Sequence, residues 1–170
     1  MNPIEARRMR DVRRLSGCFI TRPYSIAEHC YFTGMLFEDI AEIDHVRVTR
    51  QEIHWVYRHD ALEIVTGDLL YPVKNMNEVT QKAWATIENE VVKTYPSLLP
   101  YVDDEAVLWF SLRAWRLFRE CDGLELYLFC KEERLNGNVV RNSDGSSVEK
   151  RMEAFLIHSK FKGVLALLQP

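Results

Sequence analysis

The chain has 170 residues, 47% of them hydrophobic and 28% charged, and a formal net charge of -3 at pH 7. This composition predicts a single globular domain over residues 1–170 with a sizeable core, and it excludes a disordered or low-complexity chain. The slightly negative charge gives no general basic surface, so we expect no nucleic-acid polymer as a partner. A local run of arginines is more often a solvated face and leaves such binding as a minor alternative; its members are Arg7, Arg8, Arg10, Arg13 and Arg14.

The cysteines and the apolar runs indicate the compartment. No two of the four cysteines are spaced as C-x-x-C, and the chain shows no secretory signal, so neither a zinc ribbon nor a disulfide framework is expected. The longest apolar runs are far shorter than the roughly 20 residues of a membrane span. We therefore expect a cytoplasmic protein with no membrane partner.

Capping boxes mark the starts of two predicted helices. The segment S-I-A-E at 25–28 predicts a helix that begins at Ile26, and T-R-Q-E at 49–52 predicts a second helix that runs to a stop at Gly67. In both segments apolar residues then recur near the 3.6-residue period of a helix.

The middle of the chain is also predicted to be helical. A third helix should begin after Asn77 and run to about Tyr95, before two prolines. The stretch 103–136 is too long for one ordinary helix, so we expect at least two helices there, with a break between Leu108 and Leu112.

The last part of the chain completes a helical prediction. A flexible loop over 136–147 precedes one amphipathic helix over about 148–168. No segment shows the alternation of a strand. The sequence therefore predicts an all-α, single-domain bundle of six or seven helices.

Four ionisable residues lie together in a segment that otherwise has the pattern of a buried helix: His59, Asp60, Glu63 and Asp68. On a helix His59 and Glu63 share a face, and Asp60 lies about 100° round from His59. A further histidine, His29, lies early in the helix before. Imidazoles and carboxylates from several helices commonly hold a divalent metal. Spacing alone leaves a second interpretation open, in which the histidines are hydrogen-bonded core residues and Asp68 belongs to a turn.

Two longer segments are similar to one known family. "RLSGCFITRPYSIAEHC" at 14–30 has an arginine, a glycine-containing loop and a Y-S-x-A-E-H helix start. "HDALEIVTGDLLYPVK" at 59–74 meets every fixed position of H-D-x-x-E-x-x-x-G-D-x-x-x-P-x-K. Over a core of about residues 10–136 the chain resembles the HD-domain metal-dependent phosphohydrolases, and most closely the branch of bacterial 5′-deoxynucleotidases and phage nucleotide phosphohydrolases.

The resemblance implies a metal centre. Carried over residue by residue, it makes His29, His59, Asp60 and Asp122 the ligands of a divalent ion, which would be Co²⁺, Mn²⁺, Ni²⁺, Zn²⁺ or Mg²⁺. Such an ion lowers the pKa of a bound water and neutralises charge on phosphoryl oxygens. Asp122 is the least specific of the four, because a lone aspartate within a long helix is common.

The resemblance also implies roles for five residues around the metal. Glu63 would orient or deprotonate the attacking water, and Asp68 would lie near the sugar and the scissile ester. Arg14 and Lys74 would contact the phosphate.

Leu15 stands where the best-known members have a tryptophan that helps to exclude the ribose 2′-hydroxyl, so sugar selectivity stays open. Phe19, Ile20 and Tyr24 are either walls of a base pocket or ordinary core residues.

The implied function is hydrolysis of deoxynucleotides, most simply as a 5′-deoxynucleotidase that releases phosphate from a deoxynucleoside monophosphate. One alternative is a deoxynucleoside triphosphate triphosphohydrolase, such as a phage dATPase. Another is a non-catalytic module that only binds a nucleotide. The resemblance further suggests a homo-oligomer, and similarity to phage nucleotide phosphohydrolases suggests a phage-encoded gene that acts in the host cytoplasm. A di-iron oxygenase would need extra ligands from His45, His54 and His158, and is disfavoured.

Overall fold

The computed structural model describes residues 1, 3–69, 71–74, 76–102 and 106–169. Within these ranges the chain is helical and contains no strand, which confirms the all-α class; two isolated bridges pair Arg13 with Ser25 and Arg141 with Ser147. The helices are α1 (Pro3–Arg8), η1 (Met9–Asp11), α2 (Ile26–Ile43), α3 (Arg50–Val56), α4 (Glu63–Thr66), α5 (Tyr71–Lys74), α6 (Glu78–Thr94), η2 (Pro96–Tyr101), α8 (Leu112–Leu135), α9 (Val148–Leu156) and α10 (Lys162–Leu167).

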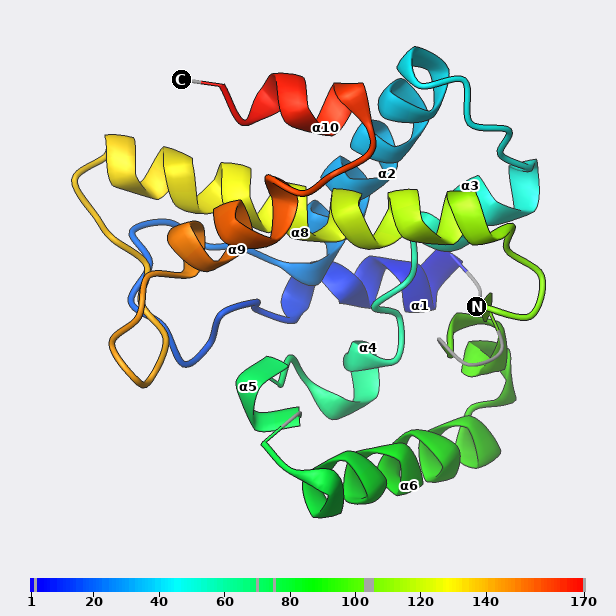
Figure 1. Cartoon of the computed structure of the whole chain (residues 1–170). Helices are drawn as coiled ribbons and strands as arrows, with labels where there is room; N and C mark the ends of the chain where they lie inside the picture. The colour runs from blue at the N-terminus through cyan, green and yellow to red at the C-terminus, as the bar shows by residue number, and fades with distance from the viewer. Residues whose placement is uncertain (2, 70, 75, 103–105, 170) are drawn as a thin grey trace.

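Two long helices form the centre of the molecule. α8 runs across it, α2 crosses behind α8, and α9 lies along the front of α8 (Figure 1). Apolar side chains from both long helices and from α3 pack between them, among them Phe37, Ile40, Trp55, Leu117 and Phe118. α5 and α6 lie apart from this centre, at the bottom of the view (Figure 1). Among the described residues, no helix is both long and apolar enough to cross a bilayer.

Hydrogen-bonded caps set the helix starts where the sequence predicts them. At the start of α3, the Thr49 side chain accepts from the Glu52 N–H at 3.1 Å and the Glu52 carboxylate accepts from the Thr49 N–H at 2.5 Å. The Ser25 hydroxyl caps α2 by accepting from the Glu28 N–H at 3.2 Å. The Ser111 hydroxyl caps α8, which confirms a break between Leu108 and Leu112. Residues 103–105 of the helix expected before that break lie outside the described residues.

The helix predicted from 50 to 66 is interrupted, and this was the main error in the predicted elements. α3 ends at Val56, residues 57–62 form turns, and α4 begins only at Glu63. In the turns the Nδ1 atom of His59 donates to the Val56 carbonyl at 2.8 Å, and backbone bonds join residues three apart, as from Ala61 N to Arg58 O at 2.9 Å. His59 and Asp60 therefore project from a turn, where adjacent side chains can reach one centre.

The predicted C-terminal helix is also two helices. α9 ends at Leu156, and α10 starts at Lys162. The Asp44 carboxylate, from the end of α2, accepts from the backbone N–H groups of Lys162 and Gly163, both at 2.8 Å. A cap supplied by a distant side chain cannot be seen in local periodicity. Such interruptions are why the described residues hold nine α-helices where six or seven were expected.

Candidate metal centre and active site

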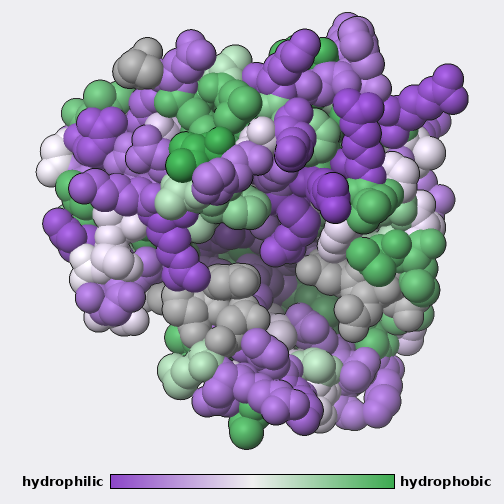
Figure 2. All heavy atoms as spheres, in the orientation of Figure 1, coloured by the Kyte–Doolittle hydropathy of each residue, from purple (hydrophilic) through white to green (hydrophobic). Residues whose placement is uncertain are grey.

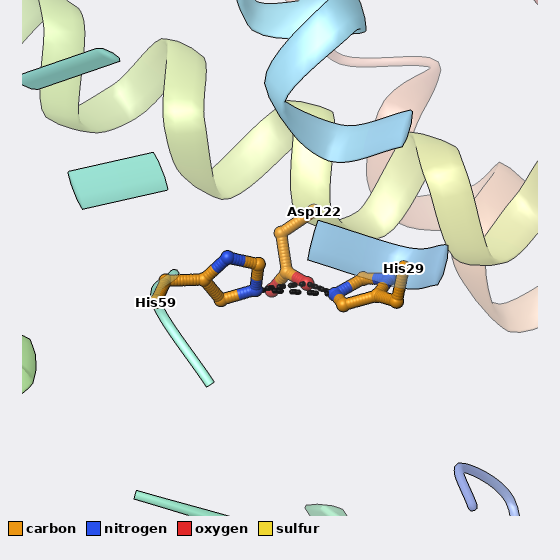
Figure 3. A group of neighbouring side chains, drawn as sticks. All are labelled: His29, His59 and Asp122. Carbon is orange, nitrogen blue, oxygen red and sulfur yellow. Dashed lines mark hydrogen bonds and ion pairs between the residues drawn. The ribbon is translucent and has the colours of Figure 1, made fainter. Parts of the chain in front are cut away.

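His29, His59 and Asp122 come together from three elements. His29 lies in the first turn of α2, His59 in the turns after α3, and Asp122 near the middle of α8 (Figure 3). The Nε2 atom of His29 is 3.0 Å from Asp122 Oδ1 and 3.1 Å from His59 Nε2, and His59 Nε2 is 3.8 Å from Asp122 Oδ1. Ligand atoms about 2.0–2.3 Å from one ion lie at such separations from each other. The three residues therefore have the spacing of a metal site.

Asp60 lies beside these three residues, between the two histidines and Arg14. Its Oδ1 is 3.5 Å from His59 Nε2, and its Oδ2 is 3.7 Å from His29 Nε2. Oδ2 also forms an ion pair with the guanidinium of Arg14. The carboxylate thus contacts both imidazoles and the arginine of the N-terminal segment.

The hydrogen bonds behind the two imidazoles test whether the donor set fits a metal. The Val56 carbonyl can only accept, so His59 carries a proton on Nδ1 and has its lone pair on Nε2 when neutral. The Nδ1 atom of His29 is 2.5 Å from a carboxylate oxygen of Glu125 and is likewise the donor. Both Nε2 lone pairs then face the same centre, which is the arrangement a divalent cation needs. Two nitrogens and up to two carboxylates fit a borderline ion such as Zn²⁺, Co²⁺ or Mn²⁺.

The shifted pKa values of the metal-free site also indicate a site for a cation. Burial and Arg14 would lower the pKa of His29, but Glu125 and Asp122 outweigh them and raise it to about 9. Burial alone would raise the pKa of Asp122, yet the hydrogen bond from His29 and the nearby histidines hold it well below its usual range. A cation is therefore favoured at this point, and a proton on His29 supplies the positive charge in the absence of a metal.

Glu63 and Lys74 form the second part of the site. Lys74 Nζ is 3.1 Å from Glu63 Oε1, and the lysine also lies over the ring of Trp84, 4.8 Å from its centroid. Glu63 is only 6% exposed, and its Oε2 atom has no hydrogen-bond partner within the described part of the chain. Burial, followed by the charge of Asp60, raises the pKa of Glu63 to about 8. An ionised Glu63 would be a ready proton acceptor with one oxygen to spare.

Arg14, Leu15 and Asp68 form a third part of the site, joined by contacts at the turn after Arg14. Leu15 has a φ of 55°, a left-handed conformation that is uncommon for a residue with a β-carbon. Its backbone N–H donates to Asp68 Oδ2 at 2.8 Å. Leu15 is buried in a cluster with Tyr24 and Phe129, so its side chain packs in the core. Asp68 thus fixes the turn that follows Arg14, a contact that the sequence did not reveal.

Other predicted residues have clear positions. Tyr24 is fully buried and contacts His29, so it belongs to the core and not to a base pocket. Phe19 is 78% exposed, and Ile20 packs against the cluster that contains Leu15. Within the described residues, the possible metal groups include none of the three histidines expected outside the site, which are all exposed: His45, His54 and His158.

Sequence reasoning missed two residues near the metal centre. Glu125 is one turn beyond Asp122 on α8 and is buried against His29. A carboxylate three residues after a suspected ligand, in the otherwise uncharged stretch 123–130 of α8, was the available signal. Arg119 lies one turn before Asp122 and is close enough to help lower its pKa.

Figure 2 shows a hollow on one face of the molecule. The molecule is hollowed between the body formed by α2 and α8 and the part that carries α5 and α6, and the atoms visible in the hollow are mainly hydrophilic (Figure 2). The hollow lies above α5, which ends at Lys74.

Comparison with known proteins identifies the family. The family model described as 5′-deoxynucleotidase YfbR-like matches residues 5–161. The chain belongs to the YfbR-like 5′-deoxynucleotidase family. Its relatives include the 5′-deoxynucleotidase YfbR of Escherichia coli O127:H6, with 31% identity over 132 residues, covering 69% of this chain and 64% of the relative. The 5′-deoxynucleotidase of Shewanella oneidensis is 28% identical over 160 residues, covering 88% of this chain and 80% of that protein.

Solved structures of HD phosphohydrolases share the fold. An HD-domain phosphohydrolase from Listeria innocua superposes with a TM-score of 0.77 at 17% identity, over 97% of this chain and 83% of that one. The HD phosphohydrolase DatZ of cyanophage S-2L, bound to dA and one catalytic Zn²⁺ ion, gives a TM-score of 0.64 at 22% identity, over 99% of this chain and 92% of that one. These likenesses confirm the predicted HD-type helical fold.

Proposed function

We propose that this chain is a divalent-metal-dependent 5′-deoxynucleotidase, which hydrolyses a deoxynucleoside monophosphate to the deoxynucleoside and phosphate. The observation that carries the proposal is the convergence of His29, His59 and Asp122, with Asp60 beside them, in a member of the YfbR-like family. The curated relatives named as 5′-deoxynucleotidases support the substrate class.

His29, His59, Asp60 and Asp122 would hold the ion. When bound, the ion supplies a water of lowered pKa and neutralises charge on the phosphoryl oxygens. His29 and His59 would each keep a proton on Nδ1 and donate it, to the Glu125 carboxylate and the Val56 carbonyl respectively, so that both imidazoles bind as neutral groups. Asp60 would in addition hold Arg14 by its ion pair, with the guanidinium facing the phosphate position.

Glu63 would be the group that takes the proton of the attacking water. It is buried, its Oε2 atom is unpartnered within the described residues, and its pKa is raised to about 8, close to the working pH of a general base. Lys74 holds the other oxygen and so fixes which one faces the water. Asp68 would fix the Arg14–Leu15 turn and lie near the sugar and the ester.

The charges favour a monophosphate over a triphosphate. Arg14 and Lys74 are each already paired with a carboxylate, so the site offers little excess positive charge for the roughly four charges of a triphosphate. Two further arginines that lie near His29 and His59 in the sequence bind other partners. Arg22 binds Glu28 at 2.5 Å and Glu132 at 3.0 Å, and Arg58 donates to the His54 carbonyl at 3.1 Å.

A substrate panel tests this proposal. The purified protein would be freed of metal, supplied with Co²⁺ or Mn²⁺, and incubated with deoxynucleoside and ribonucleoside monophosphates and with dATP. We expect deoxynucleoside and phosphate from the monophosphates. Release of deoxyadenosine and intact triphosphate from dATP, with dAMP untouched, would replace the proposal by the triphosphohydrolase. Nucleotide binding with no hydrolysis would favour the alternative of a non-catalytic nucleotide-binding module. Comparison of dAMP with AMP would show whether Leu15 still permits sugar selectivity.

We further propose that residues 1–170 act as one HD domain, as a homo-oligomer in the cytoplasm, without a nucleic-acid or membrane partner, and that the gene is phage-encoded. Family membership and the match over residues 5–161 support the single domain. The likeness to a cyanophage protein is compatible with the phage origin. Light scattering of the purified protein tests the oligomeric state.

A further inference from the structure

A buried carboxylate lies directly behind one proposed metal ligand. Glu125, on α8, is 5% exposed, and His29, in the first turn of α2, is fully buried. The 2.5 Å contact joins His29 Nδ1 to Glu125 Oε2. The Tyr24 hydroxyl donates to the same oxygen and is 3.2 Å from His29 Nδ1.

Tyr24 is itself held in a fixed position. Its ring stacks on Phe129, one turn beyond Glu125 on α8, with centroids 3.9 Å apart and planes 11° from parallel. Its backbone carbonyl accepts from the Arg14 N–H at 2.8 Å. The three side chains behind the imidazole are therefore tied on one side to α8 and on the other to the segment that carries the proposed phosphate-binding arginine.

The charge of Glu125 needs a positive partner, which is either a proton on His29 or a divalent ion bound on the far side of the His29 ring. Among the described residues, the contacts recorded for its carboxylate are with His29 and Tyr24, and neither of these is a permanent cation. A buried carboxylate with only neutral partners is costly. A divalent ion on the far side of the imidazole offsets that cost through the ring, while the carboxylate makes Nε2 a stronger donor to the ion.

We propose that Glu125, held by Tyr24, is the positioning residue that fixes the tautomer and orientation of His29 and thereby sets the affinity of the centre for its divalent ion. The inference rests on the proposed metal site, and it deepens that proposal by assigning control of metal affinity to two residues outside the ligand set. Glu125 keeps the proton on Nδ1, and the Tyr24 hydroxyl keeps the carboxylate turned toward the ring.

Metal affinity measured without nucleotide tests the inference. Co²⁺ would be titrated into metal-free protein and followed by its visible absorption and by calorimetry. In Glu125→Gln the amide can donate to or accept from the ring and no longer fixes the tautomer, so we expect Co²⁺ affinity to fall about 10–100-fold. Tyr24→Phe should weaken binding by less, because the carboxylate remains. Glu125→Asp, which restores the charge, should recover part of the loss.

A second buried glutamate on the same helix provides the control. Glu133 is fully buried two turns further along α8 and accepts from Thr21 N at 2.7 Å and Asn138 Nδ2 at 2.7 Å. Glu133→Gln should lower thermal stability and leave Co²⁺ affinity within about threefold of wild type.

Three outcomes decide the matter. Weaker Co²⁺ binding in Glu125→Gln than in Glu133→Gln, at similar helical content, supports the inference even if no nucleotide is hydrolysed. Unchanged Co²⁺ affinity in Glu125→Gln overturns it, whether or not dAMP is a substrate. Equal losses in both variants overturn it as well, because a general effect of α8 stability would then explain them.

Discussion

The two parts of the site are held in different ways. The proposed ligands His29 and Asp122 project from the two longest described helices, which pack against each other through a continuous apolar core. Glu63 and Lys74 lie on α4 and α5, helices of four residues each, and are held mainly by their mutual ion pair. Side chains on long, packed helices keep their geometry before a ligand arrives, and those on short helices depend on their polar partners.

This difference suggests a division of tasks. The α2–α8 part is built to bind an ion at a fixed point. In the α4–α5 part, Lys74 lies over the ring of Trp84, and the Oε2 atom of Glu63 has no hydrogen-bond partner within the described residues. Such a carboxylate suits the exchange of a proton with a substrate or water. Changes to the first part should act on metal binding, and changes to the second on turnover.

The largest expected effect comes from a ligand of the α2–α8 part. Asp122→Asn keeps the shape of the side chain and removes its charge, so Co²⁺ affinity should fall by at least about 100-fold, more than for a residue behind the ligands. Hydrolysis of dAMP should fall with it and recover only in part at high Co²⁺. Calorimetry and product analysis on the same preparation measure both. A variant that binds Co²⁺ as wild type does would remove Asp122 from the ligand set.

The next effect should separate turnover from metal binding. Glu63→Gln removes the proton acceptor and leaves the ligands, so kcat should fall by about 10²–10⁴-fold, with Co²⁺ affinity within about threefold of wild type. Glu52→Gln is a matched control, since Glu52 is an equally buried glutamate that caps α3 and binds the Ser111 N–H at 3.0 Å. Near wild-type turnover in Glu63→Gln would end its proposed role.

The pH dependence of stability should report on both parts in metal-free protein. The pKa of His29 is raised from 6.5 to about 9, and that of Glu63 from 4.5 to about 8. Each group holds its proton in the folded state at a pH where the unfolded chain has lost it, so the free energy of unfolding falls as pH rises. The fall due to Glu63 lies between about pH 4.5 and 8, and that due to His29 between about pH 6.5 and 9.

Urea unfolding of chelator-treated protein measures this dependence. Glu63→Gln should flatten the part of the curve between about pH 4.5 and 6.5, where His29 does not contribute, and leave the fall above pH 8 in place. Stability that rises through these windows in the metal-free wild type would contradict the raised pKa values.

The smallest expected effect concerns the hydrogen bond between the Leu15 N–H and Asp68. Asp68→Ala frees the Leu15 N–H and should loosen the turn that carries Arg14, so KM for dAMP should rise several-fold. Asp68→Asn keeps a side-chain oxygen that can accept from the Leu15 N–H, so KM should stay closer to wild type if Asp68 acts through the turn. If the Asp68 carboxylate instead acts on the sugar or the ester, Asp68→Asn will raise KM as much as Asp68→Ala.

The sequence predicted the parts of the fold that depend on local signals. The caps at Ser25 and Thr49 and the break before α8 follow from side chains that bond to nearby backbone, and these were confirmed. The cap that Asp44 gives to α10 was not predictable, because Asp44 lies far from Lys162 in the sequence. The break at residues 57–62 was missed as well; there His59 contacts His29 and Asp60 contacts Arg14, both distant in the sequence. Propensity and period are weak guides where such contacts compete.

The candidate site was predictable to a similar extent. The resemblance seen in the sequence named His29, His59, Asp60 and Asp122 together, and the structure brings these four side chains to one place. The role of each as a ligand stays a prediction. The contact of Glu125 with His29 was not predicted, because the two residues are 96 positions apart in the sequence. The Leu15–Asp68 bond was not predicted either, because the sequence pattern does not indicate a positive φ at a leucine.

The most direct test relates hydrolysis to metal occupancy. Metal-free protein would be titrated with Co²⁺ while ion binding is followed by visible absorption and dAMP hydrolysis by chromatography of the products. We predict that the rate rises in proportion to the occupancy of a single site, and that deoxyadenosine and phosphate form in equal amounts. Full hydrolysis before any ion is bound, or a filled site with no hydrolysis of any deoxynucleoside monophosphate, would contradict the account.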